Sequence, residues 1–256
     1  EYYREIQNYE LAIEKFSTCL KLNNNFIPAL VNRSICLMEI SNFELALEDI
    51  NNCIKVDPNN YLLYDIKGNI LKNIGKLDDS IKFFKKSIEL NPYDRKIKFN
   101  LAETYLRQGN FEEGLILYEN RNTGTLGKFK NLYQTKNLLD YKDSIKDKKI
   151  LVYSEQGLGD NLNFFRYLEL LIKSEAQVFF KVNKNLISFL KNSKLKINYI
   201  TNEEKYEDYD YHIPLMSLPL YFNQRIDNIP KKNKYFYLDT NKINDFKNKN
   251  ISKLKN

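Results

Sequence analysis

The sequence predicts a multidomain protein in which an all-α repeat solenoid is followed by an α/β domain with a parallel sheet. Hydrophobic positions recur every 34 residues in the first half, this period stops after Arg121, and short apolar runs then alternate with helix-like segments. With 256 residues and 43% hydrophobic content, the chain can form two cores. We expect the repeats at 1–121, a linker or docking segment at 122–148, and the α/β domain at 149–256.

Composition excludes some classes of protein. The formal net charge of +7 does not indicate a nucleic-acid partner, because the lysines are scattered among Asn, Asp and Glu. No apolar run is long enough for a membrane span, so we expect a cytoplasmic protein, and the heavy Lys, Asn and Ile usage indicates a genome composition bias that lowers the weight of the charge. The three cysteines form no CxxC pair and have no nearby histidine, so neither a metal site nor a disulfide is expected.

Three registers define the repeat, and each holds over four copies. The small positions are Ala12, Ala46, Ser80 and Gly114, preceded by Tyr9, Phe43, Leu77 and Phe111 and followed by Phe16, Ile50, Phe84 and Tyr118. Each copy carries two helix-period patterns, such as "IPALVNRSICLMEI" and "FELALEDINNCIKV". The small residues stand where two helices must cross closely.

This period, with Pro58 and Pro92 closing two of the units, resembles the tetratricopeptide repeat. Gly75 and Gly109 are predicted to form the turn between the two helices of a repeat, where a positive φ favours glycine. Cys19 and Cys53 occupy equivalent positions and are interpreted as packing residues. Residue 1 falls in the middle of a helix and is not Met, so we expect further repeats upstream.

The second half has a different pattern. Strands are predicted at "KILVYS" (149–154), "AQVFFKV" (176–182), "KINYI" and "DYHIPL", with helices at 161–173 and "NLISFLKN". Strands that alternate with helices favour parallel βαβ units and hence a Rossmann-like domain.

The stretch "SEQGLGDNLNFFRY" (154–167) connects the first of these strands to its helix. Ligands bind at this end of a parallel sheet, and Gly157 and Gly159 are expected to let the backbone turn tightly and approach a ligand. A dinucleotide site fits poorly because Leu162 replaces the third glycine, and a P-loop would need GK[ST], which this loop lacks.

"EQGLGDNLNFFRYLELL" and "YDYHIPLMSLPLYF", together with "YENR" (118–121), resemble bacterial proteins that join tetratricopeptide repeats to a two-lobed (GT-B) glycosyltransferase related to the heptosyltransferases. The resemblance implies that Asp160 is the general base on the acceptor hydroxyl. The alternative is that Asp160 only caps the helix. Further substrate-binding candidates are Glu155, Gln156, Gly157, Gly159, Asn161, Arg166 and Ser217.

Two of the candidate site residues, His212 and Arg166, also have a purely structural interpretation. His212, the single histidine, precedes the SLP segment and is a second catalytic candidate, although a lone histidine is more often a packing or surface residue. Arg166 points from the helix either to the loop or to solvent, and Ser217 and Pro219 shape their loop.

A solenoid presents its first helices on a concave surface that can hold a protein or peptide. Related transferases carry an asparagine ladder there, and Asn32, Ile66 and Asn100 occupy the corresponding position, with Ile66 as an interruption. We include Asn69 among these partner-binding candidates. The alternative is a structural stack that only packs against the next domain.

The resemblance implies transfer of sugar from a nucleotide-sugar donor to a sugar or protein acceptor, without a cofactor in this chain. Because the donor lobe of such enzymes follows the acceptor lobe, we expect this chain to be inactive by itself. The alternative function is a non-catalytic scaffold for protein–protein interaction with a degenerate α/β lobe.

Overall fold

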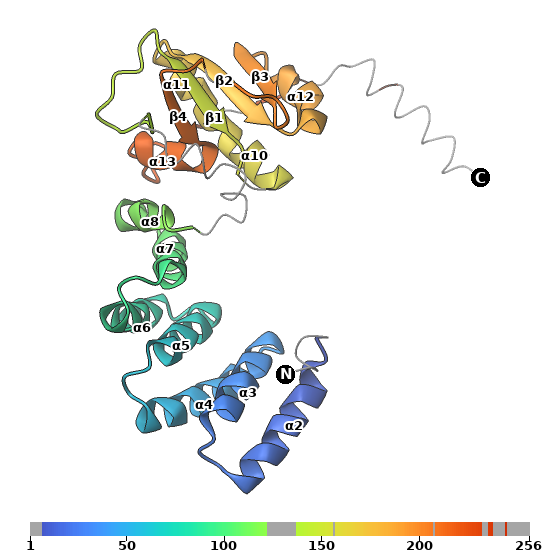
Figure 1. The fold of residues 1–256 in the computed structure, drawn as a ribbon, viewed down its shortest axis with the longest axis vertical. Coiled ribbons are helices and arrows are strands. Elements are labelled where there is room, and N and C mark those ends of the chain that lie inside the picture. Colours follow the sequence, from blue (N-terminus) through green and yellow to red (C-terminus); the bar gives the residue numbers. More distant parts are fainter. Residues whose placement is uncertain are drawn as a thin grey trace, which may run out of the picture. The chain divides into compact units, whose positions relative to one another are not determined.

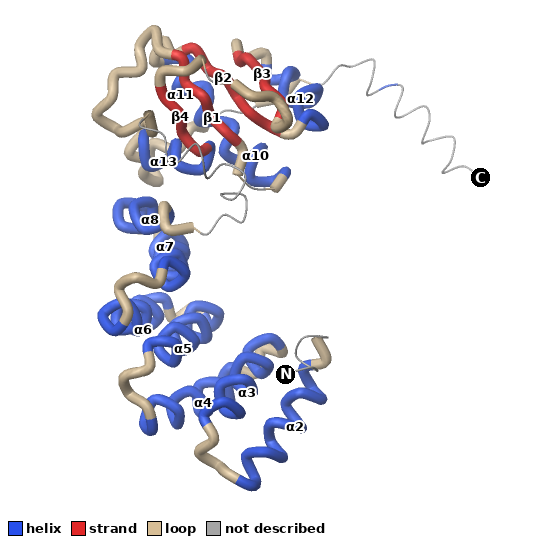
Figure 2. Tube along the Cα trace, viewed as in Figure 1, coloured by secondary structure: helices blue, strands red, loops and turns tan. Residues whose placement is uncertain are grey.

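The computed structural model describes residues 7–121, 137–155, 157–206, 208–231, 235–237 and 244. The chain divides into two compact units, residues 1–122 and 123–256 (Figure 1). The first unit is helical, and the second combines strands with helices (Figure 2).

The first unit contains the predicted repeats. Among the described residues, helix α2 (Tyr9–Leu22) is followed by three helix pairs. The pairs are α3 (Ile27–Glu39) with α4 (Phe43–Val56), α5 (Tyr61–Ile74) with α6 (Leu77–Leu90), and α7 (Arg95–Gln108) with α8 (Phe111–Tyr118). Helices α3, α5 and α7 begin at residues 27, 61 and 95, so the 34-residue period is confirmed.

Small residues allow the two helices of a pair to pack closely. Ala46 and Ser80 are fully buried, as predicted, and a second small position on the first helix of each pair was not predicted. That position is occupied by Ser34, Gly68 and Ala102, all buried. A Cβ on Gly68 would lie 2.7 Å from the Phe84 ring, and Ser80 Oγ donates to the Gly68 carbonyl oxygen at 2.8 Å. Cys53 is also fully buried, which agrees with its interpretation as a packing residue.

The turn between paired helices requires a left-handed residue in every copy. Gly75 and Gly109 have φ of 85°, as predicted, and the equivalent residues Gln7 and Ser41 have φ of 60° and 61°. The Asn42 and Lys76 amides reach back to the carbonyls of Leu37 and Leu71, which is the Schellman pattern at a helix end. The backbone conformation therefore follows the repeat even where the sequence has no glycine.

We predict that Ser41→Gly stabilises the solenoid and that Gly75→Ala destabilises it, each by about 1 kcal/mol, because a left-handed φ strains any residue with a Cβ. No heavy atom lies within 4 Å of a Cβ built on Gly75, so the effect reports backbone strain and not a clash. Urea unfolding followed by circular dichroism measures both changes. Equal stabilities for the two variants would contradict the left-handed assignment.

The second unit carries one sheet and short helices. Its elements are β1 (Lys149–Tyr153), α10 (Leu158–Phe164), a 3-10 turn (Phe165–Tyr167), α11 (Leu168–Lys173), β2 (Gln177–Val182), α12 (Lys184–Leu190), a 3-10 turn (Lys191–Ser193), β3 (Ile197–Thr201), β4 (Tyr211–Pro214), a 3-10 turn (Leu215–Ser217) and α13 (Leu218–Tyr221). All four predicted strands are present.

The four strands are parallel and lie in the order β3-β2-β1-β4. Ile150, Val152 and Ile213 face the main apolar core, to which every described helix of the unit contributes side chains. A Rossmann-like domain has helices on both faces of its sheet. The parallel sheet is confirmed, and the Rossmann-like assignment stays a prediction.

Aromatic rings cover part of the other face of the sheet. Tyr206 stacks on Phe179 with ring centroids 4.7 Å apart, and Tyr209 meets His212 edge-on at 5.9 Å. The described residues between β3 and β4, 202–206 and 208–210, therefore place aromatic rings on the sheet, whereas the connections from β1 to β2 and from β2 to β3 are helical.

Residues 137–148, predicted as part of a linker or docking segment, belong to the second unit. The Leu139 amide donates to the His212 carbonyl at 2.9 Å, and the His212 amide donates to the Asn137 carbonyl at the same distance. Leu139 and Ile145 are buried in the main core. Residues 137–139 therefore extend the β4 edge of the sheet by one bridge, Leu138 with His212.

Candidate functional site

The first candidate site is the face of the solenoid formed by its first helices, α3, α5 and α7. Asn32 Nδ2 donates to the Pro28 carbonyl within α3 at 2.7 Å. Ile66 and Asn69 on α5 are half-buried, and Asn100 on α7 is only 8% exposed. The structure thus distributes the predicted ladder residues over three successive helices, but it gives their side chains unequal access to solvent.

Asp65, which the sequence analysis missed, organises two of these asparagines. Asn100 Nδ2 donates to Asp65 Oδ1 at 2.8 Å, and Asn69 Nδ2 donates to the same oxygen at 3.2 Å. Asp65 is 6% exposed, and this burial raises the pKa of its carboxyl group although the two amides act in the opposite direction. Val31 and Phe99 occupy the equivalent positions in the neighbouring repeats. An acidic residue at a position that is otherwise apolar was therefore the sequence signal that could have identified Asp65.

A second polar link joins α5 to α7. Lys72 Nζ lies 2.9 Å from Glu103 Oε2, with the lysine side chain 10% exposed and the glutamate side chain 43% exposed. Together with the Asp65–Asn100 hydrogen bond, this ion pair fixes the spacing of the two helices on the face where a partner would bind.

In two of the three helix pairs, a basic residue at one position of the first helix contacts both the preceding helix and the second helix of its own pair. Arg33 makes a bidentate ion pair with Asp49, at 2.8 and 2.6 Å, and also donates to Ser17. One repeat later, Lys67 donates to Asn51 at 2.7 Å and lies 4.1 Å from the centroid of the Phe83 ring. The position is retained while its chemistry changes from an ion pair to a cation–π contact.

The second candidate site lies at the carboxyl ends of β1 and β4. Strand β1 is central, with β2 on one side and β4 on the other, so the chain order reverses between β1 and β4. Ligands of open parallel sheets bind at such a switch point. Four polar residues next to these strand ends are buried, namely Ser154, Glu155, Asn161 and Ser217.

The glycine loop has a different local geometry from the one that was predicted. Gly157 has φ of −65° and Gly159 lies inside α10, so neither residue uses a left-handed conformation and the tight-turn explanation is wrong. Space is the property that distinguishes Gly159, because no heavy atom of the described residues lies within 4 Å of a Cβ built on it. Gln156 lies outside the described residues.

Asp160 lies in the first turn of α10 and is half-buried. The N-cap is Gly157, without a side-chain hydrogen bond, so Asp160 does not hold the cap position that its alternative role required. Asn161 Nδ2 donates to the Gly157 carbonyl at 2.8 Å and closes the loop instead. The catalytic role of Asp160 stays a prediction.

The structure places Arg166 and His212 in packing environments. Arg166 donates to the carbonyl and side-chain oxygens of Asn163 and lies 5.3 Å from the centroid of the Tyr235 ring. His212 is completely buried within β4, with ring contacts to Tyr153 and Tyr209. The predicted roles of Arg166 in binding and of His212 in catalysis stay predictions without added geometric support.

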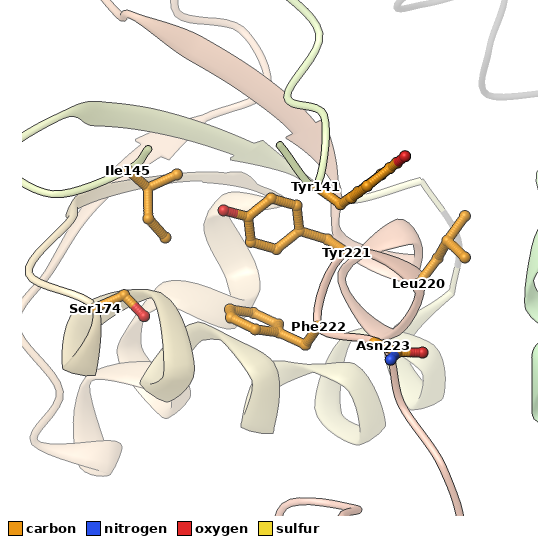
Figure 3. Close-up of a pocket in the computed structure, with 7 residues that line it drawn as sticks. All are labelled: Tyr141, Ile145, Ser174, Leu220, Tyr221, Phe222 and Asn223. Atoms are coloured by element: carbon orange, nitrogen blue, oxygen red, sulfur yellow. The ribbon is translucent and has the colours of Figure 1, made fainter. Parts of the chain in front are cut away.

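A pocket of about 630 Å³ lies away from the predicted residues (Figure 3). It is lined by Tyr141, Ile145, Ser174, Leu220, Tyr221, Phe222 and Asn223. Ile145 precedes β1 and Ser174 precedes β2, so the pocket is at the opposite end of these strands from the glycine loop. None of the predicted site residues lines it.

The described part of the chain has neither a metal-binding cluster nor a membrane-spanning helix. No group of three or more His, Cys, Asp or Glu residues there could hold a metal ion. No helix among the same residues is long and apolar enough to cross a membrane.

A tetratricopeptide repeat family model matches residues 62–94, which are most of α5, all of α6 and the following turn. The chain contains tetratricopeptide repeats. No curated protein matches the chain.

Solved structures of MamA are similar to this chain. "MamA 41-end from Desulfovibrio magneticus RS-1" has 18% identity and a TM-score of 0.45, and covers 52% of this chain and 72% of its own. "Crystal structure of MamA" has 21% identity and a TM-score of 0.43, and covers 52% and 77%.

We predict opposite effects for two Gly→Ala substitutions. Gly159→Ala leaves stability unchanged or raises it by up to about 1 kcal/mol, because the added methyl enters open space and alanine favours the helix. Gly68→Ala lowers stability by about 1–3 kcal/mol, because the methyl meets the buried Phe84 ring. Thermal unfolding of both variants measures the contrast. A destabilised Gly159→Ala would show that the space at the glycine loop is needed for folding.

Proposed function

We propose that this protein is an interaction scaffold that holds an extended protein segment along α3, α5 and α7. The observation that carries the proposal is the succession of three first helices at a constant 34-residue interval. Repeats stacked in this way form an extended concave surface from their first helices.

The side chains on this face suit a peptide. Leu62 is 48% exposed and Ile66 is half-buried, so the face offers apolar contacts to a bound segment. Asn32 and Asn69 add side-chain amides on neighbouring helices, and amides pair with the backbone groups of an extended chain. Such a surface favours a segment that alternates apolar and polar side chains.

We predict that Leu62→Ser weakens peptide binding about fivefold, because roughly 1 kcal/mol of apolar contact is lost. Peptides are selected from a random 12-residue phage library on the whole chain, and the dissociation constant of a synthetic hit is measured by fluorescence anisotropy. Lys82→Ser is the matched control, because Lys82 is exposed on the second helix α6. Equal effects of the two substitutions would place the binding surface elsewhere.

A second candidate function is specific to the α/β unit. We propose that it is the acceptor lobe of a glycosyltransferase-like protein and binds a hydroxyl-rich acceptor at the carboxyl ends of β1 and β4. The buried polar residues at this switch point, and the open space at Gly159, favour a polar ligand there. Asp160, half-buried in the first turn of α10, is the candidate base.

For this candidate, Asp160→Asn in a protein that carries a donor lobe should lower sugar transfer at least 100-fold, since general-base catalysis contributes about 10²–10⁴-fold. The unfolding midpoint should stay close to that of the wild type. Transfer from labelled nucleotide sugars is the assay, and the exposed Asp227→Asn is the control. Undiminished turnover would remove Asp160 from the mechanism, and absence of turnover with every common donor would favour the scaffold function only.

A further inference from the structure

Asp65 is a buried acidic residue on α5, and only one of its two carboxylate oxygens accepts hydrogen bonds from described residues. Its Oδ1 accepts both side-chain amides, from Asn69 and Asn100, while its Oδ2 accepts no hydrogen bond from any described residue. No basic group in the described ranges lies within ion-pair distance of either oxygen. A carboxylate removed from water in this way is costly unless a cation or further donors compensate it.

The same solenoid shows what full compensation requires. Asp49 is 1% exposed, and both of its oxygens accept hydrogen bonds from the Arg33 guanidinium, at 2.6 and 2.8 Å. Asp65 is buried to a similar degree but receives only two neutral amides on a single oxygen. Relative to Asp49, the group that Asp65 lacks is a guanidinium.

The basic residues around Asp65 do not supply this group. Lys72, on the same helix, pairs with Glu103 instead. Lys96 on α7 acts on Asp65 only through the electrostatic field and is opposed by Asp94. No described basic residue therefore forms an ion pair with Asp65, and a cation that completes the site would come from outside the described residues.

The helix face next to Asp65 can also accommodate the stem of a long basic side chain. Leu62 and Asn69 are three residues before and four residues after Asp65, so they share its face of α5. Leu62 offers apolar surface to methylene groups, and the charged end of such a side chain reaches a carboxylate while its stem packs on apolar atoms.

We infer that Asp65 binds an arginine side chain of the segment held by the scaffold, with the guanidinium donating to Oδ2. The inference rests on the proposed scaffold function and names the chemistry of its partner. Asn69 and Asn100 hold the carboxylate in place and act as positioning residues. The bound segment is therefore expected to carry arginine at the position that lies against α5 and α7.

The test uses N-acetyl-arginine amide as the probe and N-acetyl-citrulline amide as its uncharged counterpart. Binding is followed with the whole chain through the side-chain NH₂ resonances of Asn69 and Asn100 in ¹⁵N-resolved NMR spectra. We expect saturable shifts at both asparagines with the arginine probe and at least tenfold weaker binding of the citrulline probe. Equal binding of the two probes, or no shift up to about 50 mM arginine probe, against the roughly 1 mM dissociation constant that a binding free energy of about −4 kcal/mol gives, would overturn the inference.

Asp65→Asn provides the second arm. It keeps the size of the side chain and one oxygen for the two amides but removes the charge, so the fold is expected to survive and arginine binding to fall at least tenfold. Asp79→Asn is the matched control, because Asp79 is an exposed acid on α6 and its substitution should leave binding unchanged. Undiminished binding in Asp65→Asn overturns the inference.

The outcomes separate this inference from the scaffold proposal. If the selected peptides bind in the wild type and Leu62→Ser weakens them while the arginine probe fails, the arginine site is overturned and the scaffold stands. If peptide binding is insensitive to both Leu62→Ser and Asp65→Asn, both proposals are overturned.

Discussion

The close approach of two helices within each repeat is the constraint on which the solenoid depends. Gly68 lies so near the Phe84 ring that a methyl group would meet it at 2.7 Å. The crossing also buries main-chain carbonyl groups, and serine hydroxyls donate hydrogen bonds to two of them. Ser80 donates to the Gly68 carbonyl, and Ser87 donates to the Tyr61 carbonyl at 2.7 Å. A 34-residue period follows, because every copy must present a small residue at the same crossing.

All repeats share this packing, but their polar contacts at equivalent positions differ. Arg33 forms an ion pair with Asp49, whereas Lys67 at the same position contacts Asn51 and the Phe83 ring. Asp65 likewise replaces an apolar residue of the neighbouring repeats. Buried polar groups cost stability unless they are paired, so their variation within a constant frame is where individual repeats acquire specific chemistry. For this reason the non-repeating positions are more informative about partners than the repeating ones.

The repeat could be predicted from the sequence because it depends on periodic size and hydrophobicity, which a single chain displays directly. The turns at Gly75 and Gly109 could be predicted as well, whereas Gln7 and Ser41 adopt the same left-handed backbone without a glycine to indicate it. The packing of the two surrounding helices imposes the left-handed backbone conformation, so this conformation does not require a glycine at the turn.

The roles of the asparagines could not be predicted in the same way. Asn69 and Asn100 are 31 residues apart, and both amides donate to one carboxylate oxygen of Asp65, while Asn69 also donates to the Asp65 main-chain carbonyl at 2.9 Å. That choice of partner depends on the distance between α5 and α7 to within a fraction of an ångström, and hydrogen bonds are lost beyond about 3.5 Å. Sequence spacing placed these side chains on the right helices but could not tell whether they face a ligand or a neighbouring carboxylate.

The α/β unit shows the same limit at its glycine loop. The strands and their parallel order follow from apolar runs that alternate with helix-period segments, and this placed the loop correctly at the end of β1. The tight-turn reason for its glycines was not correct, because neither has a left-handed φ, whereas close approach to a ligand stays a prediction. With backbone strain excluded, the physical property left at Gly159 is the absence of a side chain in open space beside buried polar residues. A glycine that costs helix stability and relieves no strain is explained if another molecule occupies that space.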